Sequence, residues 1–325
     1  MSLLEIRQLS VFFRTGNRDV PAVDKLDLTL EAGQTTVIVG ESGCGKSATA
    51  LGIMGLLPPA PDARASGSVR LAGQELIGLD NRALRKVRGK QMAMIFQEPM
   101  TSLNPVLTIG EQIEEAILAH EGLSRRALRA RAADLLKLVR VPGGETRLDD
   151  FPHRFSGGMR QRILIAIAMA CQPQLILADE PTTALDVTIQ AQILDLLADL
   201  QDRFNMAMIL ITHDLGVVAR MADTVIAMYA GRKVEQAPVR EFFSRPSHPY
   251  TQGLLGASPH RSRGRDGGML TEIPGIVPAL RDLPAGCAFA PRCSRRFERC
   301  GERPPLFPID TRHDARCFLY EEAAQ

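Results

Sequence analysis

The sequence has no apolar run long enough to cross a membrane. A membrane-spanning helix needs about 18 consecutive apolar residues, whereas the longest candidate, residues 163–171, is much shorter and follows Arg160 and Arg162. The first ten residues, MSLLEIRQLS, also lack the basic segment and the long apolar segment of a signal peptide. These absences predict a cytoplasmic protein, which would have to dock onto a membrane-spanning partner if it acts at a membrane.

An excess of charge of one sign is also missing. The 39 Lys and Arg residues nearly balance the 37 Asp and Glu residues, and the net charge is +2. Proteins that bind nucleic acids usually carry a strong basic excess, so the composition gives no support to that class. The 325 residues, of which 45% are hydrophobic, suit a globular protein with one large domain and an appendage, or with two modest domains.

Short apolar runs alternate with helical stretches through the first part of the chain. Continuous apolar runs suit strands of a parallel sheet that is covered on both faces; they lie at residues 37–39, 92–96, 175–178 and 206–211. Residues 108–140 and 188–204 instead repeat apolar side chains at helical spacing. This pattern predicts an α/β domain over residues 1–235 with an inserted helical subdomain at about residues 100–170. Frequent prolines then predict a small C-terminal extension over residues 236–325.

Residues 40–47, GESGCGKS, match the phosphate-binding pattern G-x-x-x-x-G-K-[ST] between an expected strand and an expected helix. Glycines let backbone N–H groups converge on phosphate oxygens, and the helix N-terminus adds partial positive charge. We expect Lys46 to reach the β- and γ-phosphates of ATP and Ser47 to bind Mg²⁺. The full set of expected nucleotide contacts in this loop is Gly40, Glu41, Ser42, Gly43, Cys44, Gly45, Lys46, Ser47 and Ala48.

Two acidic residues, Asp179 and Glu180, end the apolar run 175–178. Unpaired buried charge is costly, and ligands bind at the C-terminal ends of parallel strands. Asp179 therefore fits a ligand of Mg²⁺ and Glu180 a general base that polarises the attacking water; two residues at a solvent-exposed helix start are the alternative. His213 follows another apolar run and fits a contact to the γ-phosphate or the attacking water, with a structural role as its alternative.

Residues 155–162, FSGGMRQR, resemble the LSGGQ signature of ABC-type ATPases, with Phe155 in place of Leu and Met159 in place of Gln. Ser156, Gly157 and Gly158 at a helix start form a second arrangement suited to anions, although this segment alone also fits an ordinary glycine-capped helix start. Together with the preceding motifs, it makes about residues 3–235 similar to an ABC-type ATPase.

This resemblance implies a P-loop NTPase core with a parallel sheet, an antiparallel β subdomain and the inserted helical subdomain. It also implies that a second ATPase subunit completes each ATP site, because Ser156, Gly157 and Gly158 would close over ATP bound by the partner. Four further roles are implied. Phe13, or its neighbour Phe12, would stack on adenine, and Gln97 would sense Mg²⁺ and face a membrane subunit. Asp186 would lie with Ala184 and Leu185 in a loop that crosses to the partner site, and His213 would act as the switch histidine.

Three further segments resemble the ATP-binding subunits of dipeptide, oligopeptide and nickel importers. These are residues 181–192, 247–251 and 273–278, the last of which looks especially like the dipeptide-importer subunit. The resemblance implies a subunit that hydrolyses ATP to drive import of dipeptides or oligopeptides, with nickel chelates or haem as alternative cargo. It also implies a paralogous second ATPase, two transmembrane permease subunits and an extracytoplasmic substrate-binding protein, with this chain at the cytoplasmic face of the inner membrane.

Four of the six cysteines crowd the C-terminal extension, with the spacing C-x5-C-x6-C-x16-C: Cys287, Cys293, Cys300 and Cys317. In a reducing cytosol such a group favours a metal centre over disulfides. Four thiolates suit either zinc or a [4Fe–4S] cluster, and similar importer tails carry the cluster; zinc and reduced free cysteines are the alternatives. His313 is a spare ligand that we expect in the second shell or at the surface.

Two other functions stay open at this point. A soluble ABC ATPase of translation or DNA repair would usually carry two cassettes or long insertions, which this chain lacks. A non-catalytic regulatory module would not need all the catalytic motifs, which are intact here. Cys44 could make the phosphate loop sensitive to oxidation, although any small residue would fit its position.

Overall fold

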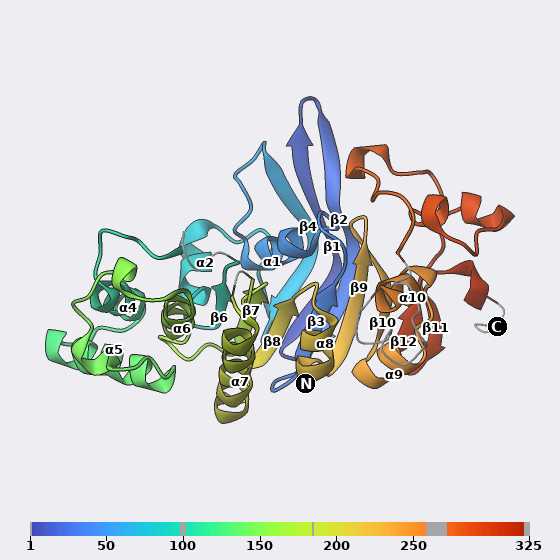
Figure 1. Ribbon diagram of the computed structural model, residues 1–325. Coiled ribbons are helices and arrows are strands. Elements are labelled where there is room, and N and C mark those ends of the chain that lie inside the picture. Colours follow the sequence, from blue (N-terminus) through green and yellow to red (C-terminus); the bar gives the residue numbers. More distant parts are fainter. Residues whose placement is uncertain (1, 98–101, 184, 258–271, 322–325) are drawn as a thin grey trace. The chain divides into compact units, whose positions relative to one another are not determined.

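The computed structural model describes residues 2–97, 102–183, 185–257 and 272–321 (Figure 1). The chain forms two compact units. The helical unit comprises residues 31–34 and 78–210, and the P-loop unit comprises residues 2–30, 35–77 and those described beyond 210. Ala184, in the expected loop toward a partner site, lies outside the described residues.

The P-loop unit contains two groups of strands. The four-stranded antiparallel sheet has the order β2-β1-β4-β5, and the other strands follow the order β11-β12-β10-β9-β3, with β3 and β9 parallel. The bounds are β1 Leu4–Thr15, β2 Arg18–Leu30, β3 Thr35–Val39, β4 Ala63–Leu71, β5 Gln74–Glu75, β9 Thr224–Tyr229, β10 Arg232–Pro238, β11 Phe307–Asp310 and β12 His313–Ala315. All residues of β3 are buried, which explains why this strand is an unbroken apolar run.

The α-helices that the described residues of the P-loop unit form are α1 Lys46–Met54, α8 Leu215–Met221, α9 Val239–Ser244 and α10 Pro249–Gly256. Helix α1 follows the glycine loop that leaves β3, as the sequence predicts. Helix α10 opens at Pro249 and is capped by the His248 side chain, which accepts a hydrogen bond from the Tyr250 amide at 3.0 Å. Proline suits this position because the first helical N–H has no partner within the helix.

Among its described residues, the helical unit contains three neighbouring strands and five α-helices. The strands are β6 Met92–Ile95, β7 Leu175–Asp179 and β8 Ala207–Ile211, in the order β8-β7-β6, and β6 and β7 are parallel. The helices are α2 Asn81–Val87, α4 Ile109–Leu118, α5 Arg125–Leu138, α6 Gly157–Ala168 and α7 Val187–Phe204. The strand predicted through residue 96 ends at Ile95, because the Phe96 side chain is exposed rather than packed in the sheet.

Polar residues set the ends of the inserted helices. Thr108 and Glu111 form a reciprocal capping box at the start of α4, and Ser124 caps α5 through the Ala127 amide. Helix α7 ends at Asn205 in the left-handed conformation. Helices α4, α5 and α6 all lie between β6 and β7 in the sequence, where the apolar periodicity predicted a helical insertion.

A buried carboxylate ties the C-terminal extension to β10. Glu235 is fully buried and accepts hydrogen bonds from the Ser247 and His248 amides, each at 2.8 Å. The same side chain contacts His313 of β12, with 2.9 Å between Oε1 and Nε2. His313 is 1% exposed, so the expectation of a histidine at the surface is wrong, and the residue is instead a buried partner of Glu235. Buried charge is tolerated there because several donors satisfy it.

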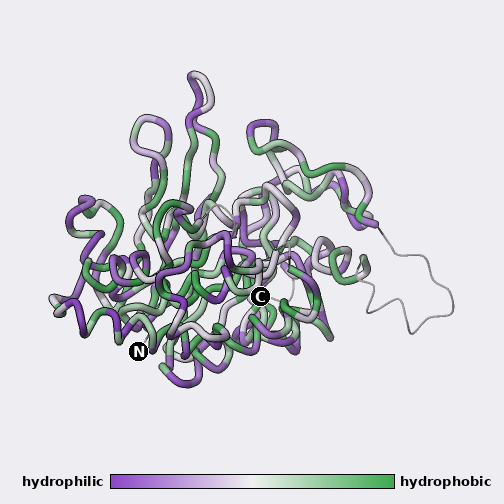
Figure 2. The backbone as a smooth tube through the Cα atoms, turned by 60° about the vertical axis from the view of Figure 1, so that its left-hand side comes forward, coloured by the Kyte–Doolittle hydropathy of each residue, from purple (hydrophilic) through white to green (hydrophobic). Residues whose placement is uncertain are grey.

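No helix among the described residues has both the length and the apolar character needed to span a membrane. Figure 2 colours the chain by hydropathy, and hydrophilic segments there occupy many of the outer loops. In the P-loop unit, the largest fully buried side chains of β1 and β2 are Leu4, Ile6, Leu9, Leu26 and Leu30. These two strands therefore supply much of the apolar core of the P-loop unit.

Candidate functional site

The glycine loop between β3 and α1 has a backbone conformation that leaves no room for a side chain at two of its positions. Gly40 and Gly45 have φ values of 156° and 99°. A Cβ atom at Gly40 would lie 2.3 Å from the Met228 carbonyl oxygen, and one at Gly45 would lie 2.2 Å from the Ala22 carbonyl oxygen. Glycine is required at both positions because the loop packs directly against neighbouring backbone.

Lys46 is folded back over this loop. Its ammonium group donates hydrogen bonds to the carbonyl oxygens of Gly40 at 2.8 Å and Glu41 at 3.2 Å, and the residue is 7% exposed. Ser42, Gly43 and Ser47 are exposed beside it, while Ala48 is half-buried. Helix α1 begins at Lys46. Its first backbone N–H groups and the positive end of its dipole therefore lie at the glycine loop together with the Lys46 ammonium group, an arrangement that suits phosphate binding.

Cys44 lies inside the loop and is fully buried. Burial raises the pKa of its thiol, and the nearby Lys46 charge lowers it to a lesser extent. A neutral, buried thiol reacts slowly with oxidants and alkylating agents. The structure therefore favours the interpretation of Cys44 as a small packing residue over that of a redox switch.

The two adjacent phenylalanines of β1 differ in their surroundings. The Arg64 guanidinium lies 4.5 Å from the Phe12 ring centroid, and Phe12 and Arg64 are directly opposite in the β1–β4 pairing. Phe13 points to the other face of the strand because successive side chains alternate, and it is half-buried. Of the two candidates for stacking on adenine, Phe13 is the one whose ring is not already covered by Arg64.

His213 follows the end of β8 and is exposed. The preceding residue, Thr212, donates its backbone N–H to the Ile38 carbonyl of β3 at 3.2 Å. Since Gly40 follows Ile38 by two residues, this bond places the His213 segment beside the start of the glycine loop. The structure thus brings together two motifs that the sequence separates by more than a hundred residues.

In the helical unit, the Gln97 side chain meets the predicted general base. Gln97 Nε2 donates to Glu180 Oε2 at 3.1 Å, and Thr183 Oγ1 donates to the same oxygen at 2.9 Å. Glu180 has a φ of 46°, an uncommon conformation for a non-glycine residue that often marks a functional position. Asp179, the last residue of β7, is buried. Three residues predicted from separate motifs or roles therefore lie around the end of one strand.

The Ser-Gly-Gly segment forms the start of α6. Ser156 Oγ accepts a hydrogen bond from the Met159 amide at 3.4 Å. Gly158 packs against α7, where a Cβ atom would lie 2.6 Å from Ile189 Cγ2. Asp186 caps α7 by accepting from the Ile189 amide at 2.9 Å. The signature segment and the expected partner-facing loop are thus held together through Ile189.

The four clustered cysteines lie in the P-loop unit as free thiols. The Cys287 amide donates to the Cys300 carbonyl at 3.0 Å. Burial raises the pKa of Cys317 to about 11, and repulsion from the other three thiols contributes to that shift. The thiols therefore sit near one another, yet within the described ranges no group of three or more metal-ligating side chains has the geometry of a metal site.

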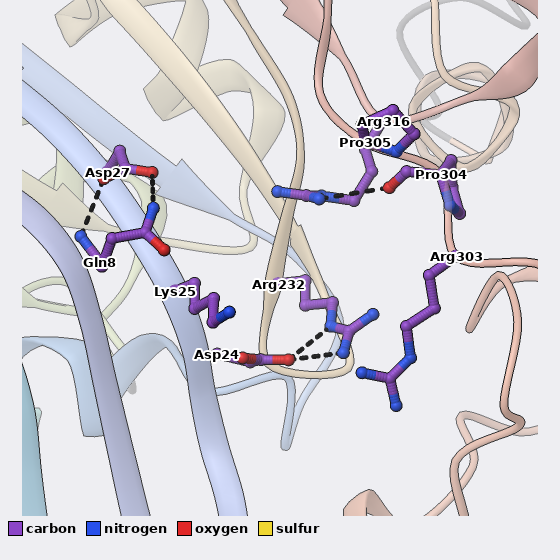
Figure 3. Close-up of a pocket in the computed structure, with 9 residues that line it drawn as sticks. All are labelled: Gln8, Asp24, Lys25, Asp27, Arg232, Arg303, Pro304, Pro305 and Arg316. Carbon is purple, nitrogen blue, oxygen red and sulfur yellow. Dashed lines mark hydrogen bonds and ion pairs between the residues drawn. The ribbon is translucent and has the colours of Figure 1, made fainter.

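A polar cavity of about 330 Å³ lies elsewhere in the P-loop unit (Figure 3). It is lined by Gln8, Asp24, Lys25, Asp27, Arg232, Arg303, Pro304, Pro305 and Arg316. Arg232 is paired with Asp24, with 2.9 Å between Nε and Oδ2. None of the residues that the motifs single out lines this cavity.

Two residues that sequence reasoning did not assign to the site contact the glycine loop. The Arg292 guanidinium pairs with the Glu41 carboxylate, and the Tyr250 hydroxyl accepts a hydrogen bond from the Glu41 amide. Tyr250 lies in the segment 247–251, whose resemblance to importer subunits was a usable signal. Nothing in the sequence indicated that Arg292 contacts the glycine loop, because an arginine next to a cysteine suggests only that it offsets the negative charge of a thiolate.

Two protein-family models match the chain. A model described as "ABC transporter" matches residues 23–183, and one described as "Oligopeptide/dipeptide transporter, C-terminal region" matches residues 234–300. The first covers the glycine loop, Gln97, the Ser-Gly-Gly segment and the Asp179–Glu180 pair. The second covers the Tyr250 segment and three of the four clustered cysteines.

Curated relatives are similar over nearly the whole chain. A putative peptide import ATP-binding protein of Brucella melitensis is 49% identical over 332 residues, covering 99% of this chain and 98% of that protein. The oligopeptide transport ATP-binding protein AppD of Bacillus subtilis is 48% identical, with 99% and 98% covered. The oligopeptide transport ATP-binding protein OppD of Salmonella typhimurium is 48% identical, with 97% and 93% covered.

Solved structures of ATP-binding cassettes share the fold. The ATP-binding cassette MJ0796, solved as a dimer in a post-hydrolysis state with ADP and Pi, aligns with a TM-score of 0.65 and 28% identity. The alignment covers 73% of this chain and 99% of the cassette. The uncovered quarter of the chain is close in size to the C-terminal extension.

Proposed function

Since this chain belongs to the family of ABC transporter ATP-binding proteins with an oligopeptide/dipeptide transporter C-terminal region, we propose that it hydrolyses ATP to drive peptide import. The observation that carries this proposal is the glycine loop between β3 and α1, with Lys46 folded over it. The similarity of AppD and OppD along nearly the full chain supports the peptide branch over soluble ABC ATPases of translation or DNA repair.

The loop fits a triphosphate with Mg²⁺. The close backbone packing at Gly40 and Gly45 leaves N–H groups rather than side chains to line it. Lys46 would bind the β- and γ-phosphates, while Ser47, Asp179 and Gln97 would hold the metal. Mg²⁺, when bound, neutralises charge that develops on the phosphate oxygens. Phe13 would stack on the adenine ring, because Arg64 already covers Phe12.

Glu180 is the proposed general base. Its carboxylate would accept a proton from the attacking water, while Gln97 and Thr183 orient it through the hydrogen bonds described above. His213 would hold the γ-phosphate or that water from the neighbouring strand end. The positive φ of Glu180 supports this role, since strained residues persist where their position matters.

A second ATPase subunit would complete each site. Ser156, Gly157 and Gly158 present a hydroxyl and a helix N-terminus, which suits the phosphates of ATP bound by the partner. Asp186 lies beside them and would cross to the same site. The dimeric form of the solved cassette supports this arrangement. We infer that the partner is a paralogue rather than a second copy.

We place the chain at the cytoplasmic face of the inner membrane, bound to two permease subunits that receive cargo from an extracytoplasmic binding protein. The ABC ATPase domain would span residues 1–235 and the importer-type extension residues 236–325. Dipeptides or oligopeptides are the proposed cargo, since both AppD and OppD are oligopeptide transport proteins; nickel chelates and haem are the alternatives.

The proposal is tested by purifying the tagged chain from membranes and measuring peptide uptake in cells that carry Lys46→Ala. We expect permease subunits to copurify and uptake of labelled dipeptide or oligopeptide to be lost. Copurification of ribosomes or DNA without permeases, together with normal peptide uptake, would instead favour a soluble ABC ATPase.

For the clustered cysteines we propose a structural [4Fe–4S] cluster held by Cys287, Cys293, Cys300 and Cys317. The gathering of four thiols in one small segment supports it, and a metal would add folding free energy to a segment with little core of its own. After reconstitution with iron and sulfide, about four iron atoms per chain are expected. Stoichiometric zinc without charge-transfer absorption would reject the cluster.

A further inference from the structure

An arginine of the C-terminal extension contacts the glycine loop. Arg292 Nη1 lies 2.7 Å from Glu41 Oε2, and Arg292 Nη2 lies 3.0 Å from Glu41 Oε1. Two parallel charge-assisted bonds of this kind fix both distance and direction. The Arg292 side chain is 5% exposed and that of Glu41 30% exposed, so water screens this pair far less than a surface ion pair.

The remaining contacts of Arg292 hold its guanidinium in place. Its Nε donates to the Pro274 carbonyl at 2.8 Å, and Nη2 also donates to the Ile273 carbonyl at 3.3 Å. The Tyr229 hydroxyl lies 3.5 Å from Nη1. An arginine guanidinium is not deprotonated in proteins, so Arg292 stays charged. Contacts with the backbone of the extension therefore hold the Arg292 side chain in the position in which it pairs with Glu41.

A second contact from the extension holds the backbone of the same loop residue. The Glu41 N–H donates to the Tyr250 hydroxyl at 2.9 Å. Tyr250 is fully buried and packs against Tyr229 and Phe289, with ring centroids 4.8 and 5.5 Å away. Burial raises the pKa of Tyr250, so this acceptor stays an uncharged phenol. Both polar ends of Glu41 are thus fixed by residues more than 200 positions away.

An acidic residue in a phosphate-binding loop has an electrostatic cost. A free Glu41 carboxylate would repel the phosphates of ATP, and this repulsion is strong at short range in a partly buried site, where the effective dielectric constant is lower than in water. Pairing with Arg292 places a positive charge 2.7 Å from that carboxylate and so offsets its negative charge. Loss of this partner would therefore weaken the binding of ATP phosphates at the loop.

We propose that Arg292 is a positioning residue for ATP binding, which acts through Glu41 by neutralising its charge and fixing the entrance of the glycine loop. The C-terminal extension thereby contributes to the nucleotide site of its own chain. This inference rests on the proposed role of residues 40–47, and it extends that role to a part of the chain outside the cassette.

The full-length chain with Arg292→Met tests the proposal, with MgADP affinity measured by titration calorimetry and KM and kcat for MgATP measured at steady state. We expect MgADP to bind about tenfold or more weakly and KM to rise by a similar factor, because one partner of a largely buried pair is left uncompensated. The value of kcat should fall much less. Arg296→Met is the matched control, because Arg296 is exposed on the same segment, and it should behave like the wild type.

The double variant Glu41→Gln with Arg292→Met separates this role from a structural one. Removing the carboxylate removes the repulsion, so MgADP affinity should return to within about threefold of the Glu41→Gln single variant. If Arg292 only supported folding of the extension, the double variant would be no better than Arg292→Met. That result, or unchanged affinity in Arg292→Met, overturns the proposal.

Should Arg292→Met fail to fold, Arg292→Gln with and without Glu41→Gln gives the same comparison, since glutamine keeps one donor to the carboxylate. Failure of the underlying site assignment would look different. In that case Lys46→Ala would bind MgADP as tightly as the wild type, whatever residue stood at position 292.

Discussion

Glu180 is the residue on which the proposed chemistry depends most directly. It lies at the end of a buried strand, in a strained backbone conformation, and accepts hydrogen bonds from two side chains that lie 83 and 3 positions away in sequence. These contacts fix the position of its carboxylate. A neighbouring residue, Asp179, is more deeply buried and suits metal binding better than proton transfer.

The variant Glu180→Gln should hydrolyse ATP at least about a hundredfold more slowly, because removing a general base typically costs that much or more. ATP affinity should stay near the wild-type value, since the amide keeps the shape and the hydrogen bonds. Single-turnover hydrolysis and nucleotide trapping measure both quantities. Trapped ATP with a stable dimer is the expected result, and normal turnover would contradict the assignment.

Among the elements, α10 shows how a helix start connects the extension to the nucleotide loop. The His248 side chain caps this helix, the backbone amides of Ser247 and His248 donate to Glu235, and Tyr250 in the first turn reaches Glu41. The sequence motif around residues 247–251 therefore serves packing rather than direct catalysis. Burial lowers the pKa of His248 to about 4, with the Glu235 charge acting in the opposite direction.

The stability of the chain should consequently fall in mildly acidic solution. The His248 pKa is depressed in the folded state, so the unfolded state takes up its proton first, below its ordinary pKa of about 6.5. Folding stability is lost as the pH drops from there toward 4, by an amount on the order of 2 kcal/mol from this residue. Urea denaturation at pH 7.5 and pH 5 measures the loss.

His248→Asn is the matched comparison, because asparagine can still cap the helix but does not titrate. Its stability should vary less with pH than that of the wild type across this interval. Equal losses in the two proteins would show that other groups cause the pH dependence.

At the scale of the whole molecule, each half of the proposed site occurs once per chain. The glycine loop and His213 lie in the P-loop unit, while Gln97, the Asp179–Glu180 pair and the Ser-Gly-Gly segment lie in the helical unit. The proposed mechanism requires the last of these to act on the ATP of a partner. Nucleotide would then hold two ATPase subunits together, and hydrolysis would release them.

Specific ATPase activity should therefore depend on pairing. It should fall by about tenfold or more when the chain is diluted below the dissociation constant of the dimer, since mass action governs the paired fraction. Adding the paralogous subunit should restore it. The measurement is activity against chain concentration, with oligomeric state followed by light scattering. A monomer that hydrolyses ATP at the full rate would contradict the shared site.

The surface expected to meet the permeases includes Val106, a residue that is 76% exposed just before α4. A photoreactive amino acid at position 106 should crosslink to a permease subunit in membranes, because an exposed apolar side chain next to the Gln97 loop suits a protein interface. Leu319, 41% exposed in the extension, is the comparison site. Crosslinks from position 319 alone would contradict this orientation.

The sequence alone determined the features that depend on neighbouring residues. The phosphate loop, the Ser-Gly-Gly helix start and the acidic strand end were predictable because their chemistry is set by backbone conformation over a few positions, which glycine, serine and apolar runs specify locally. Strand and helix positions were predictable for the same reason. The end of β6 was predicted one residue too late, at Phe96, because this apolar residue is exposed and lies outside the strand.

Only the tertiary structure decided which distant side chains meet. The pairing of Arg292 with Glu41 spans 251 positions, and that of His313 with Glu235 spans 78. The sequence around these residues does not indicate which side chain pairs with which, because a buried pair forms only where folding brings its two members together. The contribution of the C-terminal extension to the nucleotide loop thus became visible only once β9, β10 and α10 had brought residues 41, 250 and 292 together.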